Sequence, residues 1–228
     1  MISVATMTYK RLSILEEAVY SFILQDQDDC EMVILNDNED VQYKINHKNI
    51  RIINLQTRFE TIGEKLKYCF DLCKNNYIYR LDDDDLIYKN GLLNLKKNIL
   101  SNPDYDVYRS STHHFFVNNE FKCSGGSVNN GNCYAKNYLS TIKNWKKSCN
   151  EDHFITFENN AKIYTIDCAS MIYRWGMSTY HISGIFSQER QHKEYLDLGD
   201  RSGDNLIGEI EVKPHFKHDY YKMIEDQQ

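Results

Sequence analysis

The sequence predicts an α/β domain built on a mostly parallel, doubly wound sheet flanked by helices. Strand-like and helix-like patterns alternate over residues 1–100, and no linker, repeat or Pro/Gly-rich boundary divides the 228 residues. With 41% hydrophobic residues, a chain of this length buries one sizeable core. We therefore expect a single domain over residues 1–228.

Short apolar runs predict the strands of the first half. They lie at residues 2–5, 31–36, 50–54 and 77–81. Helical patterns separate these runs, as the crossover connections of a parallel sheet require. Ligands of such sheets bind at the carboxyl ends of the strands, so the residues that follow each run are candidate site residues.

Three helices are expected in the first half. Ser13 with Glu16, and Thr61 with Glu64, have the Ser/Thr-x-x-Glu spacing of a capping box at a helix N-terminus. Apolar side chains recur on one face of the residues that follow each box, as in an amphipathic helix. The third helix, over residues 91–100, ends just before a proline.

The second half is less regular. Its expected strands and helices are few, and they predict a smaller, irregular sheet beside the main one. Expected strands lie at 105–109, 113–117 and 162–166, and expected helices at 138–147 and 216–225. Tyr105, Tyr108, Phe115 and Phe116 have strand spacing, which favours the core over a sugar-binding groove.

Charge and cysteine content exclude several classes of function. Lys and Arg number 27 against 33 Asp and Glu, a net charge of -6, and no basic stripe favours nucleic acid or an anionic membrane as a partner. The seven cysteines lack the paired spacing of a zinc site, and they indicate reduced thiols. No signal-like or membrane-length apolar segment is found. We therefore expect a cytoplasmic protein without an integral membrane segment.

An acidic run is the strongest functional signal in the sequence. Asp82, Asp83, Asp84 and Asp85 follow the strand at 77–81 without a gap. Two carboxylates ~6 Å apart repel by roughly 3 kcal/mol at an effective dielectric of 20. A bound Mg²⁺ or Mn²⁺ ion relieves this repulsion, and an Asp-x-Asp pair presents alternate residues to one face for it. A solvated acidic turn or helix N-cap is the alternative.

Several segments, taken in order, resemble the inverting family-2 glycosyltransferases of the GT-A fold. The first strand runs into Thr8-Tyr9-Lys10-Arg11, and the second ends at Asp37. The later segments that carry the resemblance are 63–67, 77–85, 150–155 and 173–181. The resemblance implies a Rossmann-like, mostly parallel sheet with a smaller acceptor-side sheet. It also implies that residues 1–100 bind the nucleotide sugar and residues 101–228 bind the acceptor.

The resemblance further implies roles for individual residues. The nucleotide-sugar site consists of Thr6, Tyr9, Arg11, Asp37, Lys65, Asp82, Asp83 and Asp85. Asp37 accepts a hydrogen bond from the uracil imide, which favours a UDP-sugar donor. Asp84 is the first candidate metal ligand, and Asp82 is the second. His181 is a further candidate, because imidazole binds manganese. An isolated histidine is more often a packed or surface residue, and that alternative stays open for His181.

Asp152 is the candidate general base, with Glu151 as the second candidate, because inverting transfer needs a carboxylate to take the proton of the acceptor hydroxyl. Both residues also suit the start of a helix. The predicted function is metal-dependent transfer of a hexosyl or N-acetylhexosaminyl group from a UDP-sugar to a glycan, protein or small-molecule hydroxyl, with Mn²⁺ or Mg²⁺ as cofactor. A nucleotidyltransferase and a non-catalytic nucleotide-sugar-binding module are the alternatives.

Overall fold

A computed structural model provides the structure of the chain. It describes residues 1–9, 12–128, 130–147, 150–175, 208–210, 216 and 218–227. Arg11 and His181, two of the predicted site residues, lie outside the described residues.

Parallel strands form the first half of the sheet, as the apolar runs predict. They are β1 (Ile2–Thr8), β2 (Cys30–Asn36), β3 (Ile50–Asn54) and β4 (Tyr77–Arg80). β1 pairs with β2 on one side and β4 on the other, and β3 pairs with β2. Because all four run in the same direction, their carboxyl ends lie at one edge of the sheet, where ligands of doubly wound sheets bind.

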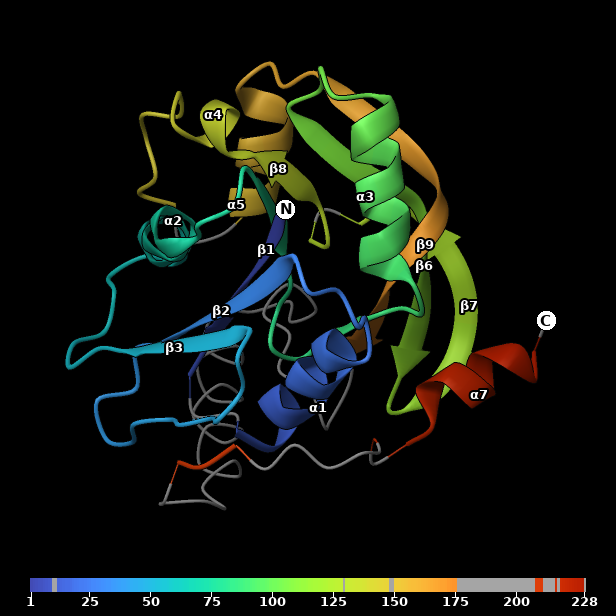
Figure 1. Cartoon of the computed structure of the whole chain (residues 1–228), viewed down its shortest axis with the longest axis horizontal. Coiled ribbons are helices and arrows are strands. Elements are labelled where there is room, and N and C mark those ends of the chain that lie inside the picture. Colours follow the sequence, from blue (N-terminus) through green and yellow to red (C-terminus); the bar gives the residue numbers. More distant parts are fainter. Residues whose placement is uncertain are drawn as a thin grey trace.

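The helices of this half lie on both faces of the sheet. They are α1 (Leu12–Ile23), α2 (Ile62–Leu72) and α3 (Gly91–Ser101). The core on one face includes Leu15 of α1 and Leu95 of α3, whereas the core on the other includes Leu66 of α2. Figure 1 shows α1 and α2 on opposite sides of β2 and β3. This arrangement confirms the doubly wound prediction.

The two capping predictions have different outcomes. Thr61 is the N-cap of α2, where its hydroxyl accepts from the Glu64 backbone nitrogen at 3.3 Å and donates to the Glu64 carboxylate at 2.8 Å. The first helix begins at Leu12, so Ser13 lies inside it and is not its N-cap. Boundaries read from sequence patterns are often displaced by a residue or two, because the pattern does not specify where the first helical turn closes.

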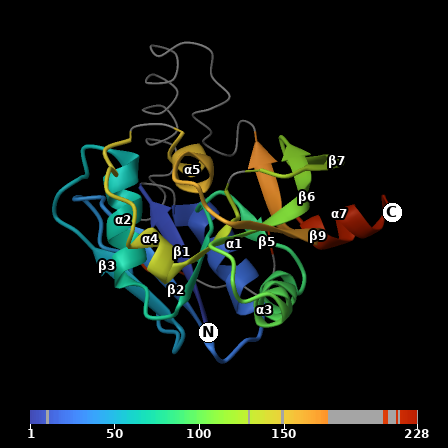
Figure 2. The ribbon, with the colours of Figure 1, turned by 90° about the horizontal axis from the view of Figure 1, so that it is seen from above.

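The second half continues the same sheet with mainly antiparallel pairs. Its strands are β6 (Val107–Val117), β7 (Glu120–Gly126), β8 (Cys133–Ala135) and β9 (Ile163–Trp175), and β9 also pairs with the two-residue strand β5 (Leu86–Ile87) of the first half. Within the described residues the sheet has nine strands, in the order β3-β2-β1-β4-β8-β6-β9-β5, with β7 paired to β6. β6 joins the two strands predicted at 105–109 and 113–117. Figure 2 shows β6, β7 and β9 projecting away from α2.

The prediction of a helix over residues 138–147 is wrong. Only a short helix, α4 (Lys136–Leu139), forms, and it ends at Ser140. The Ser140 and Thr141 hydroxyls donate to the carbonyls three residues back, and the Asn144 side chain accepts from the Lys146 nitrogen. Short polar side chains that bond the local backbone in this way compete with helix continuation.

Two shorter helical segments and a third core complete the described structure. α5 (Glu151–His153) runs directly into a π-helical turn, η1 (Phe154–Glu158), and α7 (Tyr220–Glu225) forms the helical part of the predicted tail helix. α7 packs Tyr220 and Ile224 against Phe116 of β6, which is fully buried. Tyr108 is also buried, so both aromatic residues belong to the core, as predicted. Among the described residues, no helix is long and apolar enough to cross a membrane.

Candidate active site

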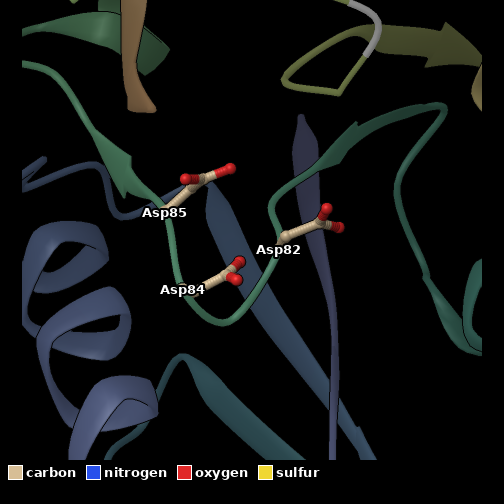
Figure 3. Close-up of side chains that lie close together, drawn as sticks. All are labelled: Asp82, Asp84 and Asp85. Carbon is tan, nitrogen blue, oxygen red and sulfur yellow. The ribbon is translucent and has the colours of Figure 1, made fainter. Parts of the chain in front are cut away.

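The acidic run forms a loop between β4 and β5, at the carboxyl edge of the parallel strands. Asp83, Asp84 and Asp85 are at most 4% exposed, and Asp82 is half-buried. One carboxylate oxygen each from Asp82, Asp84 and Asp85 lies within 4.8 Å of the others. Figure 3 shows these three side chains leaving a single turn of the loop. The cluster contains both halves of the predicted Asp-x-Asp pair and adds Asp85 to it.

Asp85 is held from both sides by groups that the sequence did not identify. Its Oδ1 accepts from the Arg174 backbone nitrogen at 2.9 Å, and its Oδ2 accepts from Asn130 Nδ2 at 2.6 Å. Burial, followed by the charges of Asp84 and Asp82, raises the pKa of Asp85 well above its ordinary value. The loop thus gathers carboxylate oxygens within 4.8 Å of one another, and oxygen ligands of this kind suit a hard divalent cation such as Mg²⁺ or Mn²⁺.

We expect Asp85→Asn to raise the melting temperature of the metal-free protein at pH 8 and to have little effect at pH 4. Because the pKa of Asp85 is raised on folding, this residue binds more protons in the folded state than in the unfolded state above pH ~4, so its contribution to stability falls as pH rises. The asparagine variant does not lose stability in this way. Each kcal/mol of unfolding free energy recovered raises the melting temperature by about 2–4 °C in a chain of this size.

Thermal melts in EDTA between pH 4 and 8 measure the effect of Asp85→Asn. Asp28→Asn is the matched control: Asp28 is exposed and its hydrogen bond to Lys48 lowers its pKa, so this variant gains nothing at pH 8. A difference between Asp85→Asn and wild type that is independent of pH contradicts the prediction.

Asp37 and Lys65 form a buried ion pair at the ends of the first two strands. Lys65 Nζ donates to the Asp37 carboxylate and, at 2.8 Å, to the carbonyl of Thr8. The Phe59 nitrogen donates to the other Asp37 oxygen at 3.3 Å. Lys65 therefore connects the ends of β1 and β2 and fixes the position of the Asp37 carboxylate.

Tyr9 follows β1 and lies next to Arg58, a residue that sequence reasoning missed. The Arg58 guanidinium carbon is 4.0 Å from the centre of the Tyr9 ring, within the range of a cation–π interaction. Thr6, in contrast, is fully buried in β1, and its hydroxyl has no hydrogen-bond partner among the described residues. The structure thus places Tyr9, Asp37 and Lys65 at the strand ends, and Thr6 deeper in the sheet.

Glu151 and Asp152 begin α5 and face the acidic loop across Arg80. Arg80, the last residue of β4, is 3% exposed. Its Nη2 donates to Glu151 at 2.9 Å, its Nη1 donates to Asp152, and its Nε donates to Asp82 at 3.0 Å. The structure therefore brings together the two carboxylate groups that the sequence separates by about 70 positions.

Among the site residues that sequence reasoning missed, Arg80 has the clearest sequence signal in retrospect. An arginine inside the strand at 77–81 needs carboxylate partners, because an unpaired buried charge is costly. The adjacent acidic run supplies one such partner. Asn130 has no comparable signal: its Nδ2 also lies 3.4 Å from Asp82, but the contact joins residues 48 positions apart.

The fold and the site together define an α/β protein with a doubly wound parallel half and an acidic loop at the carboxyl edge of its strands. Comparison with known families is more specific. The profile described as "Glycosyl transferase family 2" matches residues 3–212. The chain therefore belongs to glycosyl transferase family 2, and its fold is the GT-A fold that the sequence resemblance implies.

Solved structures of S. aureus TarS share this fold. TarS 1-349 in complex with UDP-GlcNAc aligns with a TM-score of 0.64 and 16% sequence identity, covering 88% of this chain and 66% of that one. The complex with UDP aligns with a TM-score of 0.61 and 16% identity, covering 88% and 64%. TarS 1-349 itself aligns with a TM-score of 0.59 and 16% sequence identity, covering 76% of this chain and 60% of that one.

This chain therefore spans less than two thirds of each of these TarS structures. A search of curated protein sequences found no match to the chain.

Proposed function

We propose that the chain transfers a hexosyl or N-acetylhexosaminyl group from a UDP-sugar to an acceptor hydroxyl, with inversion and with dependence on Mn²⁺ or Mg²⁺. The observation that carries this proposal is the juxtaposition of the clustered carboxylates of Asp82, Asp84 and Asp85 with the Glu151-Asp152 pair. An inverting transfer needs both: an acidic site for the diphosphate's counter-ion and a separate carboxylate base.

The strand ends provide the parts of a nucleotide site. Asp37, fixed by Lys65 and the Phe59 nitrogen, is suited to accept from the uracil imide. In this proposal Tyr9 stacks its ring on the base, and Asp82, Asp83 and Asp85 contact the ribose and donor-sugar hydroxyls. Further support for a UDP-sugar comes from the shared fold of TarS, whose structures contain UDP and UDP-GlcNAc. Thr6, Arg11 and His181 keep their proposed roles from the sequence.

In the proposed reaction Asp152 takes the proton from the acceptor hydroxyl as its oxygen attacks the anomeric carbon. The new glycosidic bond forms on the face opposite the departing UDP, whose bond to the anomeric carbon breaks. A divalent ion held by Asp84 with Asp82 would supply Lewis-acid neutralisation of the leaving diphosphate. Arg174 and Asn130 hold Asp85 and so keep the loop in place before the donor arrives.

The two halves of the chain divide the work in this proposal. Residues 1–100 contain the predicted nucleotide contacts and the acidic loop. Residues 101–228 contain the candidate base and are proposed to bind the acceptor, which is a glycan, a protein or a small molecule. Among the described residues β4 pairs with β8, so the sheet runs through both halves, which supports the proposal of a single domain over residues 1–228.

Calorimetric titration with UDP, with and without Mn²⁺, tests the proposal. We expect Mn²⁺ to increase UDP affinity at least tenfold in the wild type and to have no such effect in Asp84→Asn, because that variant loses a ligand of the ion. Asp71→Asn is the control, since this carboxylate is exposed on α2 and, among the described residues, pairs with Lys67 of the same helix.

Turnover is then measured as the release of sugar from UDP-glucose and UDP-GlcNAc, with water as the acceptor. Slow, Mn²⁺-dependent hydrolysis is the expected result. Binding of UDP without hydrolysis or transfer would favour a non-catalytic module and would overturn the catalytic part of the proposal.

A further inference from the structure

The Arg80 guanidinium connects the acidic loop to the candidate base. Its side edge, formed by Nε and Nη2, donates to both oxygens of Asp82 at 3.0 and 3.3 Å. Its end, formed by Nη1 and Nη2, donates to Asp152 and to Glu151. Two edges of one planar group therefore hold carboxylates from two parts of the site.

This geometry requires an arginine. A guanidinium presents five donors in a fixed, planar arrangement, whereas a lysine ammonium is a point charge that cannot hold three carboxylates in one plane. The strand also fixes the group: Arg80 ends β4, and its backbone nitrogen donates to the Asn132 carbonyl at 3.0 Å. The Arg80 side chain is 3% exposed, against 29% for Asp82 and 17% for Asp152. The arginine therefore lies behind the carboxylates and does not itself face the substrate.

We propose that Arg80 is a positioning residue that sets the distance and orientation of Asp152 relative to Asp82. The inference rests on the proposed function, in which Asp82 lies on the donor side and Asp152 takes the acceptor proton. A displacement of a reacting group by about 1 Å can lower the reaction rate by about 10²-fold.

The rest of the acidic loop does not depend on Arg80. Asp85 is held by Asn130 and by the Arg174 backbone nitrogen, and the Asp84 carbonyl accepts from Arg174 Nε. Changing Arg80 therefore leaves the contacts that hold Asp84, the first candidate ligand of the ion, in place, and is expected to affect the candidate base more than the binding of UDP with its ion.

Arg80→Lys tests the proposal in the full chain, with Mn²⁺ and the UDP-sugar that the wild type hydrolyses fastest. We expect kcat for hydrolysis to fall about 10–100-fold, while the Kd for UDP changes by less than about fivefold. In an Asp152→Asn background the same substitution is expected to have no further effect on kcat, because residues that act as a unit are non-additive. A merely structural role would instead multiply the two losses.

Arg51→Lys is the matched control. Arg51 also pairs with a carboxylate, Glu31 at 3.4 Å, but it lies near the amino ends of the strands, away from the site. If Arg80→Lys unfolds below the assay temperature, the double variant Arg80→Gln/Glu151→Gln is used in its place. The double variant removes one charge of each sign, and its kcat is compared with that of Glu151→Gln alone.

Three outcomes overturn the inference. The first is an unchanged kcat in a folded Arg80 variant, and the second is a further loss of kcat in the Asp152→Asn background. Either result overturns the inference and leaves the proposed function intact. Failure of the wild type to hydrolyse any UDP-sugar overturns the proposed function, and this inference with it.

Discussion

Replacing Asp152 by asparagine is expected to lower kcat for sugar transfer by about 10²–10⁴-fold, the usual contribution of a positioned general base. Asparagine retains the shape of the side chain and an oxygen that accepts from Arg80, so the loss isolates proton transfer. The Kd for UDP is expected to stay within about threefold of the wild type, because no predicted nucleotide contact involves Asp152. Steady-state kinetics and UDP titration of the purified variant measure both quantities.

Two further variants sharpen the Asp152 experiment. Glu151→Gln tests the second candidate base: Glu151 is 10% exposed against 17% for Asp152, so the acceptor has less access to it. Glu158→Gln is the control, because Glu158 is a more exposed carboxylate at the end of the same helical segment. If Glu151→Gln loses more activity than Asp152→Asn, the roles of the two carboxylates are exchanged.

The first half of the fold was predictable because each strand has an apolar sequence of its own. Buried parallel strands such as β1 and β2 read as continuous apolar runs, and helical patterns lie between them. In the second half, β6 contains the polar stretch 110–114 between two apolar ends, and its pairing with β9 shifts register twice there. The sequence therefore predicts two short strands where the structure has one. β5 has two residues, too few for any periodic pattern.

The site was predictable where its residues follow a strand directly. Tyr9, Asp37 and the run from Asp82 to Asp85 all lie at strand ends, which a doubly wound sheet brings to one edge. The contacts that Arg174 and Asn130 make with Asp85 had no local sequence signal. Arg174 contacts Asp85 from 89 positions away, and Asn130 contacts it from 45. Their roles depend on the pairing of β9 with β5 and on the turn before β8, neither of which was predicted.

Arg174 is the centre of a second buried network, which joins the acidic loop to both ends of the chain. Its side chain, 3% exposed, donates to Glu17 of α1, to the Asp84 carbonyl and, at 3.2 Å, to the Tyr220 hydroxyl of α7. Glu17 is itself only 12% exposed. Removing the arginine therefore takes a countercharge away from a buried carboxylate, which costs more than loss of a surface ion pair.

We expect Arg174→Met to lower the free energy of unfolding by about 3–5 kcal/mol, the usual cost of breaking a buried pair from one side. For a chain of this size, the melting temperature should fall by roughly 10 °C. Because the Asp84 carbonyl also loses its donor, UDP affinity in Mn²⁺ should weaken even at temperatures where the variant is folded. Denaturant unfolding and UDP titration measure the two effects separately.

A double-mutant cycle decides whether the cost of Arg174→Met arises from the pair with Glu17. Glu17→Gln with Arg174→Met removes both charges, and we expect the double variant to be more stable than Arg174→Met alone. Arg51→Met is the control: Arg51 is 34% exposed and its pair with Glu31 is longer, so the expected loss is about 1 kcal/mol or less. Equal losses at Arg51 and Arg174 would contradict the prediction. A normal UDP affinity in Arg174→Met would show that the acidic loop keeps its shape without the Arg174 side chain, held by the backbone contact to Asp85 and by Asn130.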